Sequence, residues 1–191
     1  MEAAGAGSGG YRWLGVSAVV VALDQLSKWY VTVTLSYGER IDVLPVFSWV
    51  RWHNDGAAFS LLAGSGGWQR WFFICLAAVF TVFILVELRR LQSQDRLMGF
   101  VYGLILGGAL GNAIDRIFSG YVVDFILVHY QDWYFPAFNV ADISLSIGAA
   151  LWIGVLVAAF LAEKRAGGAS ETPAGREVSG DAVRPGGSPD E

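Results

Sequence analysis

Two aspartates, Asp124 and Asp142, lie in a stretch of chain that is largely apolar and aromatic. Residues 122–146 read VVDFILVHYQDWYFPAFNVADISLS, and the second aspartate opens the last long apolar run. An acid in such surroundings is costly, so its presence indicates a chemical role. Two carboxyl groups at one site can share a proton, one acting as a base and the other as an acid. The pair therefore predicts an aspartyl hydrolase embedded in a membrane.

For hydrolysis of a peptide bond, each acid would have a definite role. The ionised aspartate takes a proton from a water held between the pair, and the protonated aspartate donates to the scissile carbonyl as the tetrahedral intermediate forms. This chemistry requires neither a metal ion nor a cofactor, and we expect none. Simpler interpretations stay open at this point. Asn139 and Asp142 fit a helix N-cap with an acid in the first turn. Asp124 could pair with Arg116.

Two further polar groups lie within apolar segments. Asp24 and Lys28 are four residues apart and share a helix face, with the acid first, the better order for pairing. We expect them to form a structural ion pair rather than a proton or substrate site. Asn112, Asp115 and Arg116 share the face of another helix, at its end. These three can pair among themselves or orient a substrate through fixed hydrogen bonds, and both interpretations stay open.

Two other classes of protein are alternatives. A Ser-Lys membrane peptidase would have to use Lys28, because Lys164 is the only other lysine, but the neighbouring Ser27 points to a different helix face. Such an enzyme would survive loss of Asp142. A non-enzymatic small membrane transporter or scaffold would use the polar groups as an ion path, and it would tolerate Asp→Asn changes.

The composition indicates an integral membrane protein with a single domain. Of 191 residues, 54% are hydrophobic and 16% are charged, whereas a soluble domain carries about 25% charged residues. The net charge is −4, and the sequence shows no basic surface that would bind nucleic acid. His53 and His129 are far apart, without partners at ligand spacing, so no metal site is predicted. The single cysteine, Cys75, lies in an apolar run, and we expect it to be buried and inert.

Four apolar segments approach or exceed the roughly 20 residues that a membrane-spanning helix needs. The expected helices cover residues 13–33, 68–88, 97–117 and 142–163. In the third segment, Gly103, Gly107 and Gly111 recur every four residues, a pattern that lets another helix approach closely. The predicted fold class is therefore membrane all-α, with four transmembrane helices in one domain over residues 13–165.

The basic residues predict the orientation of these helices. Four spans bring one group of them to the same side: Arg12, Arg89, Arg90, Arg96, Lys164 and Arg165. The positive-inside rule makes this side cytoplasmic, with residues 1–12 and 166–191. The loops 34–67 and 118–140 then lie outside. The segment 166–191 is rich in Gly, Ala, Ser, Pro and Glu, and we expect it to be disordered.

The first outer loop alternates over residues 41–52 as short strands do, with turns at Gly38, Pro45 and the triplet Asn54-Asp55-Gly56. On its own, that triplet indicates only a turn. Both outer loops are rich in aromatic residues, which favour the membrane interface. We therefore expect a small extracytoplasmic sheet at the level of the lipid headgroups, and no soluble domain.

Five sequence blocks carry a resemblance to a known family. In chain order they read DQLSK, NDGAAF, GGALGNAIDR, VVDFI and FNVADISLSI. In this order and spacing, they resemble lipoprotein signal peptidase (signal peptidase II), a family of aspartyl proteases of the bacterial inner membrane. The resemblance covers residues 24 to about 147. The chain departs from the family pattern at Ser27, where threonine is common, and in its long C-terminal tail. Neither departure affects the proposed chemistry.

The resemblance implies that Asp124 and Asp142 are the catalytic dyad. It also implies substrate-binding or supporting roles for Asn54, Gly56, Asn112, Asp115, Arg116 and Asn139. The implied substrate is a prolipoprotein with diacylglyceryl on its lipobox cysteine, and cleavage falls just before that cysteine. Membrane lipid and the antibiotic globomycin are further implied partners. The site would lie at the outer leaflet, covered by the small sheet and a mobile interfacial helix.

Overall fold

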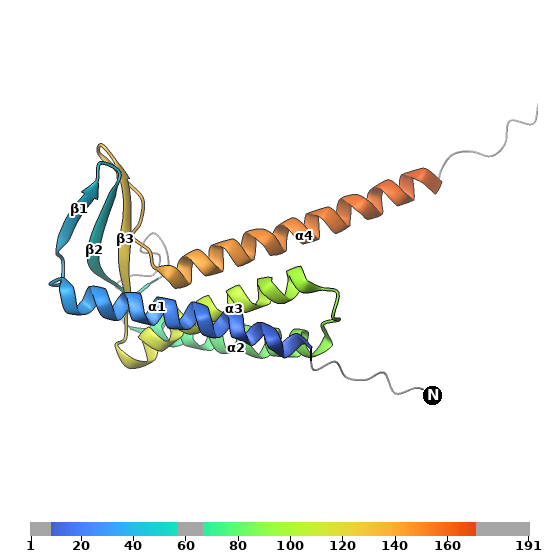
Figure 1. Cartoon of the computed structure of the whole chain (residues 1–191), viewed down its shortest axis with the longest axis horizontal. Coiled ribbons are helices and arrows are strands. Elements are labelled where there is room, and N and C mark those ends of the chain that lie inside the picture. Colours follow the sequence, from blue (N-terminus) through green and yellow to red (C-terminus); the bar gives the residue numbers. More distant parts are fainter. Residues whose placement is uncertain (1–8, 57–66, 171–191) are drawn as a thin grey trace, which may run out of the picture. The chain divides into compact units, whose positions relative to one another are not determined.

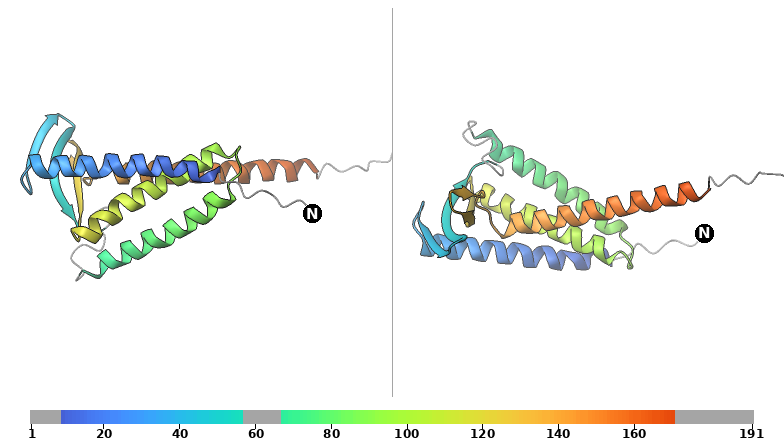
Figure 2. Two further views of the ribbon diagram at one scale, coloured as in Figure 1. Left: turned by 60° about the horizontal axis from the view of Figure 1, so that its bottom comes forward. Right: turned by 90° about the horizontal axis from the view of Figure 1, so that it is seen from above.

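Helix α3 (Arg96–Phe118) lies between α1 (Leu14–Thr34) and α2 (Trp68–Arg90) and contacts both (Figure 1 and Figure 2). The computed structural model describes residues 9–56 and 67–170. A short 3₁₀ helix, η1 (Gly10–Trp13), precedes α1, and α4 (Val140–Ser170) follows the sheet. All four predicted helical segments are therefore helices in the structure.

The glycines of α3 allow α1 to approach closely, as their spacing predicted. A Cβ atom at Gly103 would lie 2.8 Å from Cβ of Val16, and one at Gly107 would lie 2.7 Å from Cβ of Val20. A Cβ at Gly111 would lie 2.7 Å from a carboxylate oxygen of Asp24. Any larger residue would push the two helices apart, so this stripe brings the polar residues of α1 against α3.

The apolar core lies where α2 meets α3. Its buried members come from both helices: Ile84, Leu88, Val101, Tyr102, Ile105 and Leu106. Leu145 and Trp152 of α4 pack against this cluster. Cys75 on α2 is exposed, so its predicted burial is wrong. An apolar side chain on the outer face of a membrane helix contacts lipid, and this explains why the apolar run around Cys75 does not bury it.

Four strands form one antiparallel sheet in the order β1-β2-β3-β4. Their bounds are Arg40–Leu44, Phe47–Asn54, Val122–Tyr130 and Trp133–Tyr134. The small sheet and the strands of the first outer loop are confirmed. The nine-residue β3, which pairs with β2 in the middle of the sheet, comes from the second outer loop, where no strand was predicted. The described residues of these two loops contain no interfacial helix, and residues 57–66 lie outside the described part.

Three helices in the described part are long and apolar enough to cross a membrane: Trp68–Arg90, Arg96–Phe118 and Val140–Ala166. Helix α1 falls outside this group because Asp24, Gln25 and Lys28 reduce its apolar character. Helix α4 continues to Ser170, so the predicted disordered segment begins too early. Residues 162–166 (AEKRA) favour helix, and a helix that has formed extends at little cost. Residues 171–191 lie outside the described part.

The chain divides into two compact units, residues 1–154 and 155–191, with the boundary inside α4. All the residues of the site described below belong to the first unit.

Candidate active site

The first turn of α4 positions Asp142. The backbone N–H of Asp142 donates to Oδ1 of Asn139 at 3.0 Å, and the backbone N–H of Asn139 donates to Oδ2 of Asp142 at 3.2 Å. These reciprocal bonds form a capping box, in which each side chain satisfies a backbone donor at the start of the helix. The N-cap interpretation of this pair is thus confirmed. It does not exclude a chemical role, because Asp142 also lines a cavity.

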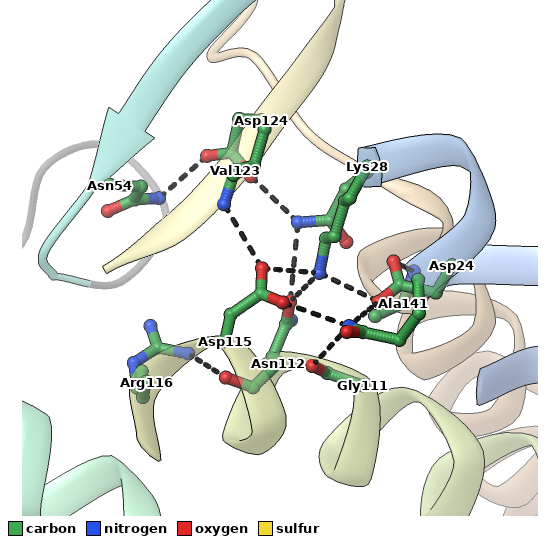
Figure 3. Close-up of polar contacts among 12 residues, drawn as sticks. Asp24, Lys28, Asn54, Gly111, Asn112, Asp115, Arg116, Val123, Asp124 and Ala141 are labelled. Carbon is green, nitrogen blue, oxygen red and sulfur yellow. Dashed lines mark hydrogen bonds and ion pairs between the residues drawn. The ribbon is translucent and has the colours of Figure 1, made fainter. Parts of the chain in front are cut away.

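Strand β3 positions Asp124. Helix α3 ends at Phe118, and Gly120 turns the chain with a φ of 89°, a left-handed conformation that favours glycine. The chain then enters β3, where the backbone N–H of Val123 donates to Oδ2 of Asp115 at 3.2 Å. This bond ties the beginning of β3 to the last turns of α3. It brings Asp124, which is 3% exposed, close to the polar residues of the helix (Figure 3).

Asn139 joins the two aspartates. Its side-chain Nδ2 donates to Oδ1 of Asp124 at 2.7 Å, while its backbone N–H reaches Asp142. The preceding Phe138 pairs with Ile126 of β3 in both directions, at 3.0 and 2.9 Å. The start of α4 is therefore fastened to β3, and the two carboxylates are held on adjoining elements.

Three asparagine side chains direct their N–H groups at the dyad. Nδ2 of Asn54 donates to Oδ2 of Asp124 at 2.9 Å, and Nδ2 of Asn112 donates to Oδ1 of Asp142 at 2.7 Å. Asn139 is the third. With the backbone N–H of Asn139, these donors give every oxygen of the two carboxyl groups one hydrogen bond. Hydrogen bonds of this kind stabilise an ionised carboxylate and hold it in one orientation.

A buried cluster of charges lies beside the dyad. Lys28, 3% exposed, reaches Asp24 at 2.7 Å, Asp115 at 3.0 Å and Oδ1 of Asn112 at 3.1 Å (Figure 3). The predicted Asp24–Lys28 ion pair is confirmed. Asp24 also accepts the backbone N–H of Ala141 at 2.9 Å, so a residue of α1 caps the first turn of α4. This contact joins residues 117 positions apart in sequence.

Gln25 belongs to the same cluster and was missed in the sequence. Its Nε2 reaches Oδ1 of Asp115 at 2.9 Å, Oδ2 of Asp24 at 3.2 Å and the carbonyl of Gly111 at 3.2 Å. A polar amide inside a predicted membrane helix is the sequence feature that could have indicated that Gln25 belongs to this cluster. Ser27, by contrast, donates to the backbone carbonyl of Asp24, and Lys28 donates to the carboxylate of Asp24. Among the described residues, no serine contacts Lys28, and this arrangement does not support a Ser-Lys peptidase.

Arg116 closes the other side of the site. Its Nη2 donates to the carbonyl of Gly56 at 2.6 Å, and its guanidinium lies 4.7 Å from the ring centre of Phe73. Gly56 in turn donates its backbone N–H to Oδ1 of Asn54 at 3.0 Å. The carboxylates are paired with asparagines, and Arg116 makes no ion pair with Asp124 in the described part of the chain. That alternative interpretation of Asp124 is therefore wrong.

Several of these side chains line a cavity of about 430 Å³. Both aspartates line it, together with Asn54, Gly56, Asn112 and Arg116 from the predicted set. Its apolar wall is formed by the segment before α4 and by one face of α4: Phe135, Pro136, Ala137, Phe138, Ile143 and Ile147. Asp115, Asn139, Asp24 and Lys28 do not line this cavity and act behind it. The cavity is thus lined by the polar groups of the candidate site and by an apolar surface.

Burial controls the protonation of Asp124. Removal from water and, to a smaller extent, the nearby charge of Asp142 raise the pKa of Asp124 to about 7. The hydrogen bonds from Asn54 and Asn139 oppose this shift. Near neutral pH, Asp124 can therefore hold a proton while a second carboxyl group stands beside it. This is the arrangement that general acid–base catalysis by a carboxyl pair needs.

The sequence matches one protein family over most of its length. The family described as signal peptidase (SPase) II matches residues 16–158. The lipoprotein signal peptidase of Serratia marcescens is 47% identical over 143 residues, which cover 75% of this chain and 83% of that protein. The lipoprotein signal peptidase of Pseudomonas syringae pv. tomato is 49% identical over 143 residues, covering 74% of this chain and 83% of that protein.

The fold matches solved structures as well. A bacterial membrane enzyme structure, determined by the in meso method at 1.9 Å resolution, is 32% identical in sequence, with a TM-score of 0.66. The match covers 76% of this chain and 92% of that one. A second structure of this description, at 2.3 Å resolution, is 31% identical with the same TM-score of 0.66.

Proposed function

The chain belongs to the signal peptidase II family and is a membrane protease that removes signal peptides from lipoproteins, and we propose that it is an aspartic endopeptidase whose catalytic dyad is Asp124 and Asp142. One observation carries this proposal. Two separate elements, β3 and α4, present these carboxyl groups to one cavity, and each group accepts a hydrogen bond on both of its oxygens. The family does not favour the alternative of a transporter or scaffold.

In the proposed mechanism, the two acids have different roles. Asp142 takes a proton from a water held between the carboxyl groups, and the resulting hydroxide oxygen attacks the scissile carbonyl carbon. Asp124, whose pKa burial raises to about 7, donates its proton to the carbonyl oxygen. When the tetrahedral intermediate collapses, the C–N bond breaks and the proton gained by Asp142 passes to the leaving amine. A hydroxyl proton of the intermediate returns to Asp124 as the new carboxyl group forms. Both acids return to their starting states.

The surrounding residues are proposed to hold the dyad and the substrate. Asn54, Asn112 and Asn139 orient the carboxyl groups through the hydrogen bonds described above. Arg116 and Gly56 form one wall of the cavity, where a guanidinium can bind substrate carbonyl groups. Asp115, which ties β3 to α3, supports the site from behind.

The proposed substrate is a prolipoprotein with diacylglyceryl on its lipobox cysteine, cut just before that cysteine. The apolar wall of the cavity supports such a substrate, because it offers lipid-compatible surface beside the catalytic acids. Globomycin-type inhibitors would occupy the same cavity. We place the site at the outer leaflet of the bacterial inner membrane, with both termini cytoplasmic.

Helix α1 is proposed as the fourth span. Its 21 residues extend about 31 Å, which matches the roughly 30 Å hydrocarbon core. Its charged residues, Asp24 and Lys28, are buried against α3 and paired, which is how charged groups are tolerated in a membrane.

The test is cleavage of a diacylglyceryl-modified prolipoprotein by the purified protein in detergent. Wild type should release the signal peptide, whereas Asp124→Asn and Asp142→Asn should lower the rate by on the order of 10²–10⁴-fold. Each variant should be checked for wild-type thermal stability. If either variant keeps near-wild-type turnover, the two-aspartate mechanism fails.

A further inference from the structure

In the described part of the chain, Lys28 is the one cation that contacts both the buried acids and a hydrogen-bond donor to the dyad. Its three N–H groups have three acceptors: Asp24 at 2.7 Å, Asp115 at 3.0 Å and Oδ1 of Asn112 at 3.1 Å (Figure 3). The first two contacts neutralise buried carboxylates, which is a structural role. The third contact leads to the catalytic centre, because Nδ2 of the same Asn112 donates to Asp142 at 2.7 Å.

The direction of the Asn112 amide follows from the chemistry of its neighbours. An ammonium group can only donate hydrogen bonds, and an ionised carboxylate can only accept them. With Lys28 on one side and Asp142 on the other, the amide oxygen must face the lysine and the amide N–H must face the aspartate. The reversed amide would place oxygen against carboxylate and N–H against ammonium, so both contacts would become repulsive.

The other two asparagines are oriented by the main chain. Oδ1 of Asn54 accepts the N–H of Gly56 at 3.0 Å, and Oδ1 of Asn139 accepts the N–H of Asp142 at 3.0 Å. Backbone donors persist whatever side chain is present. Asn112 differs, since the donors to its oxygen are the side chains of Lys28 at 3.1 Å and Asn139 at 3.3 Å. Its orientation therefore depends chiefly on the lysine, which has the shorter contact and the full charge.

We propose that Lys28 is a positioning residue of the dyad, which holds the Asn112 amide with its donor end toward Asp142 and so favours the ionised Asp142 that accepts a proton from water. This inference rests on the proposed function. Other charged groups surround the contact from Lys28 through Asn112 to Asp142. Asp24 and Asp115 face Lys28, while Arg116 and Asp124 line the cavity with Asp142. Lys28 thus acts on catalysis through Asn112, without touching the substrate.

The test compares pH profiles of kcat/KM for prolipoprotein cleavage. Lys28→Met alone would leave two buried carboxylates uncompensated, so the variant is Asp24→Asn/Lys28→Met, which keeps the net charge. We expect kcat to fall about tenfold or more, as for loss of one charge-assisted hydrogen bond, with KM changed by less than about threefold. The acid limb of the kcat/KM profile should move to higher pH by about one unit. Lys28→Arg, which keeps a donor-only cation, should restore the wild-type acid limb.

Gln25→Met is the matched control, because Gln25 contacts the same two acids and not Asn112. It should lower the melting temperature and leave the pH profile unmoved. If Lys28 were purely structural, Asp24→Asn/Lys28→Met would also lower the melting temperature without moving the pH profile. That outcome overturns the inference. If the double variant does not fold, Lys28→Gln replaces it. Glutamine keeps a donor but lets the Asn112 amide reverse, so the same shift of the acid limb is expected and its absence overturns the inference.

A double-mutant cycle with Asn112→Ala tests whether Lys28 acts on Asp142 through Asn112. If Lys28 acts through Asn112, then removing the lysine in the Asn112→Ala background should change kcat by less than about twofold. Additive losses would show that Lys28 acts by another route and would overturn the inference. The proposed function is tested separately by Asp124→Asn and Asp142→Asn. Active Asn variants would refute the dyad, whereas inactive variants with an additive cycle would refute only the role of Lys28.

Discussion

Asn139 serves both members of the proposed dyad, and its two roles can be separated by substitution. As an N-cap it accepts the N–H of Asp142, and as a side-chain donor it reaches Asp124 at 2.7 Å. Serine is also a good N-cap but is too short to reach Asp124. We expect Asn139→Ser to change unfolding free energy by less than about 1 kcal/mol. Its kcat should fall about tenfold or more, because Asp124 loses a donor.

The comparison for this variant is Asn139→Ala, which removes both roles. It should lower kcat as the serine variant does and also destabilise the helix start by about 1 kcal/mol. Thermal unfolding in detergent measures the destabilisation, and the cleavage assay measures kcat. Equal stability of the serine and alanine variants would show that the cap contributes nothing here.

Asp124 should determine the alkaline limb of the pH dependence. Burial and the charge of Asp142 raise the pKa of Asp124 to about 7, so the dyad keeps its shared proton below this pH and loses it above. Without that proton the carbonyl oxygen has no acid, and kcat/KM should fall about tenfold per pH unit on the alkaline side. A profile that stays flat to about pH 9 would show that Asp124 is not the acid.

The same raised pKa affects stability in a definite direction. Between about pH 4 and pH 7, the folded protein holds a proton on Asp124 that the unfolded chain has released. The folded state therefore binds more protons, and this group makes the fold less stable as the pH rises through that window. Melting temperature measured against pH should show the decline in wild type. It should be weaker in Asp124→Asn, which cannot titrate.

At the scale of elements, Gly108 lets α4 approach α3 next to Asp142 of the proposed dyad. A Cβ atom there would lie 2.5 Å from the carbonyl oxygen of Ala141 and 2.7 Å from Cγ of Leu145. Gly108→Ala should therefore displace the first turn of α4. We expect a destabilisation of about 1–3 kcal/mol, as for other overpacked sites, and a clear loss of kcat, because Asp142 follows Ala141.

Gly15→Ala is the control for this change. A Cβ at Gly15 on α1 has no atom within 4 Å, and alanine favours a helix by roughly 0.5–1 kcal/mol over glycine. This variant should be at least as stable as wild type, with unchanged cleavage. If Gly108→Ala behaves in the same way, the close approach of α4 is not needed for activity.

The sequence predicts elements better than the contacts between them. Asp124 and Asp142 could be selected because an acid in an apolar segment stands out locally. The glycine stripe predicted that another helix approaches this one closely, and the structure identifies it as α1. Strand β3 was missed because its residues are apolar on both faces and lack the alternation that marked β2. The cap that Asp24 provides to Ala141 was not predictable, since no local pattern links residues 117 positions apart.

At the scale of the whole molecule, the fold separates two groups of basic residues. Arg12 donates to the carbonyl of Ser93 at 3.1 Å, so it lies beside the α2–α3 connection and near Arg96. At the other ends of these helices, Arg70 donates to the carbonyl of Ile117 at 2.8 Å. By the positive-inside rule, the proposed orientation has the α2–α3 connection in the cytoplasm and the sheet outside.

Cysteine labelling can test this sidedness, because the chain has one cysteine to remove. In a Cys75→Ala background, single cysteines are introduced at two exposed positions, Ser93→Cys in the α2–α3 connection and Asp132→Cys between β3 and β4. A membrane-impermeant maleimide should label the Asp132 variant in intact spheroplasts and the Ser93 variant only after permeabilisation. Reversed labelling would place the dyad on the cytoplasmic side. A signal peptide emerging at the outer leaflet could not reach it there, so the orientation and the substrate assignment stand or fall together.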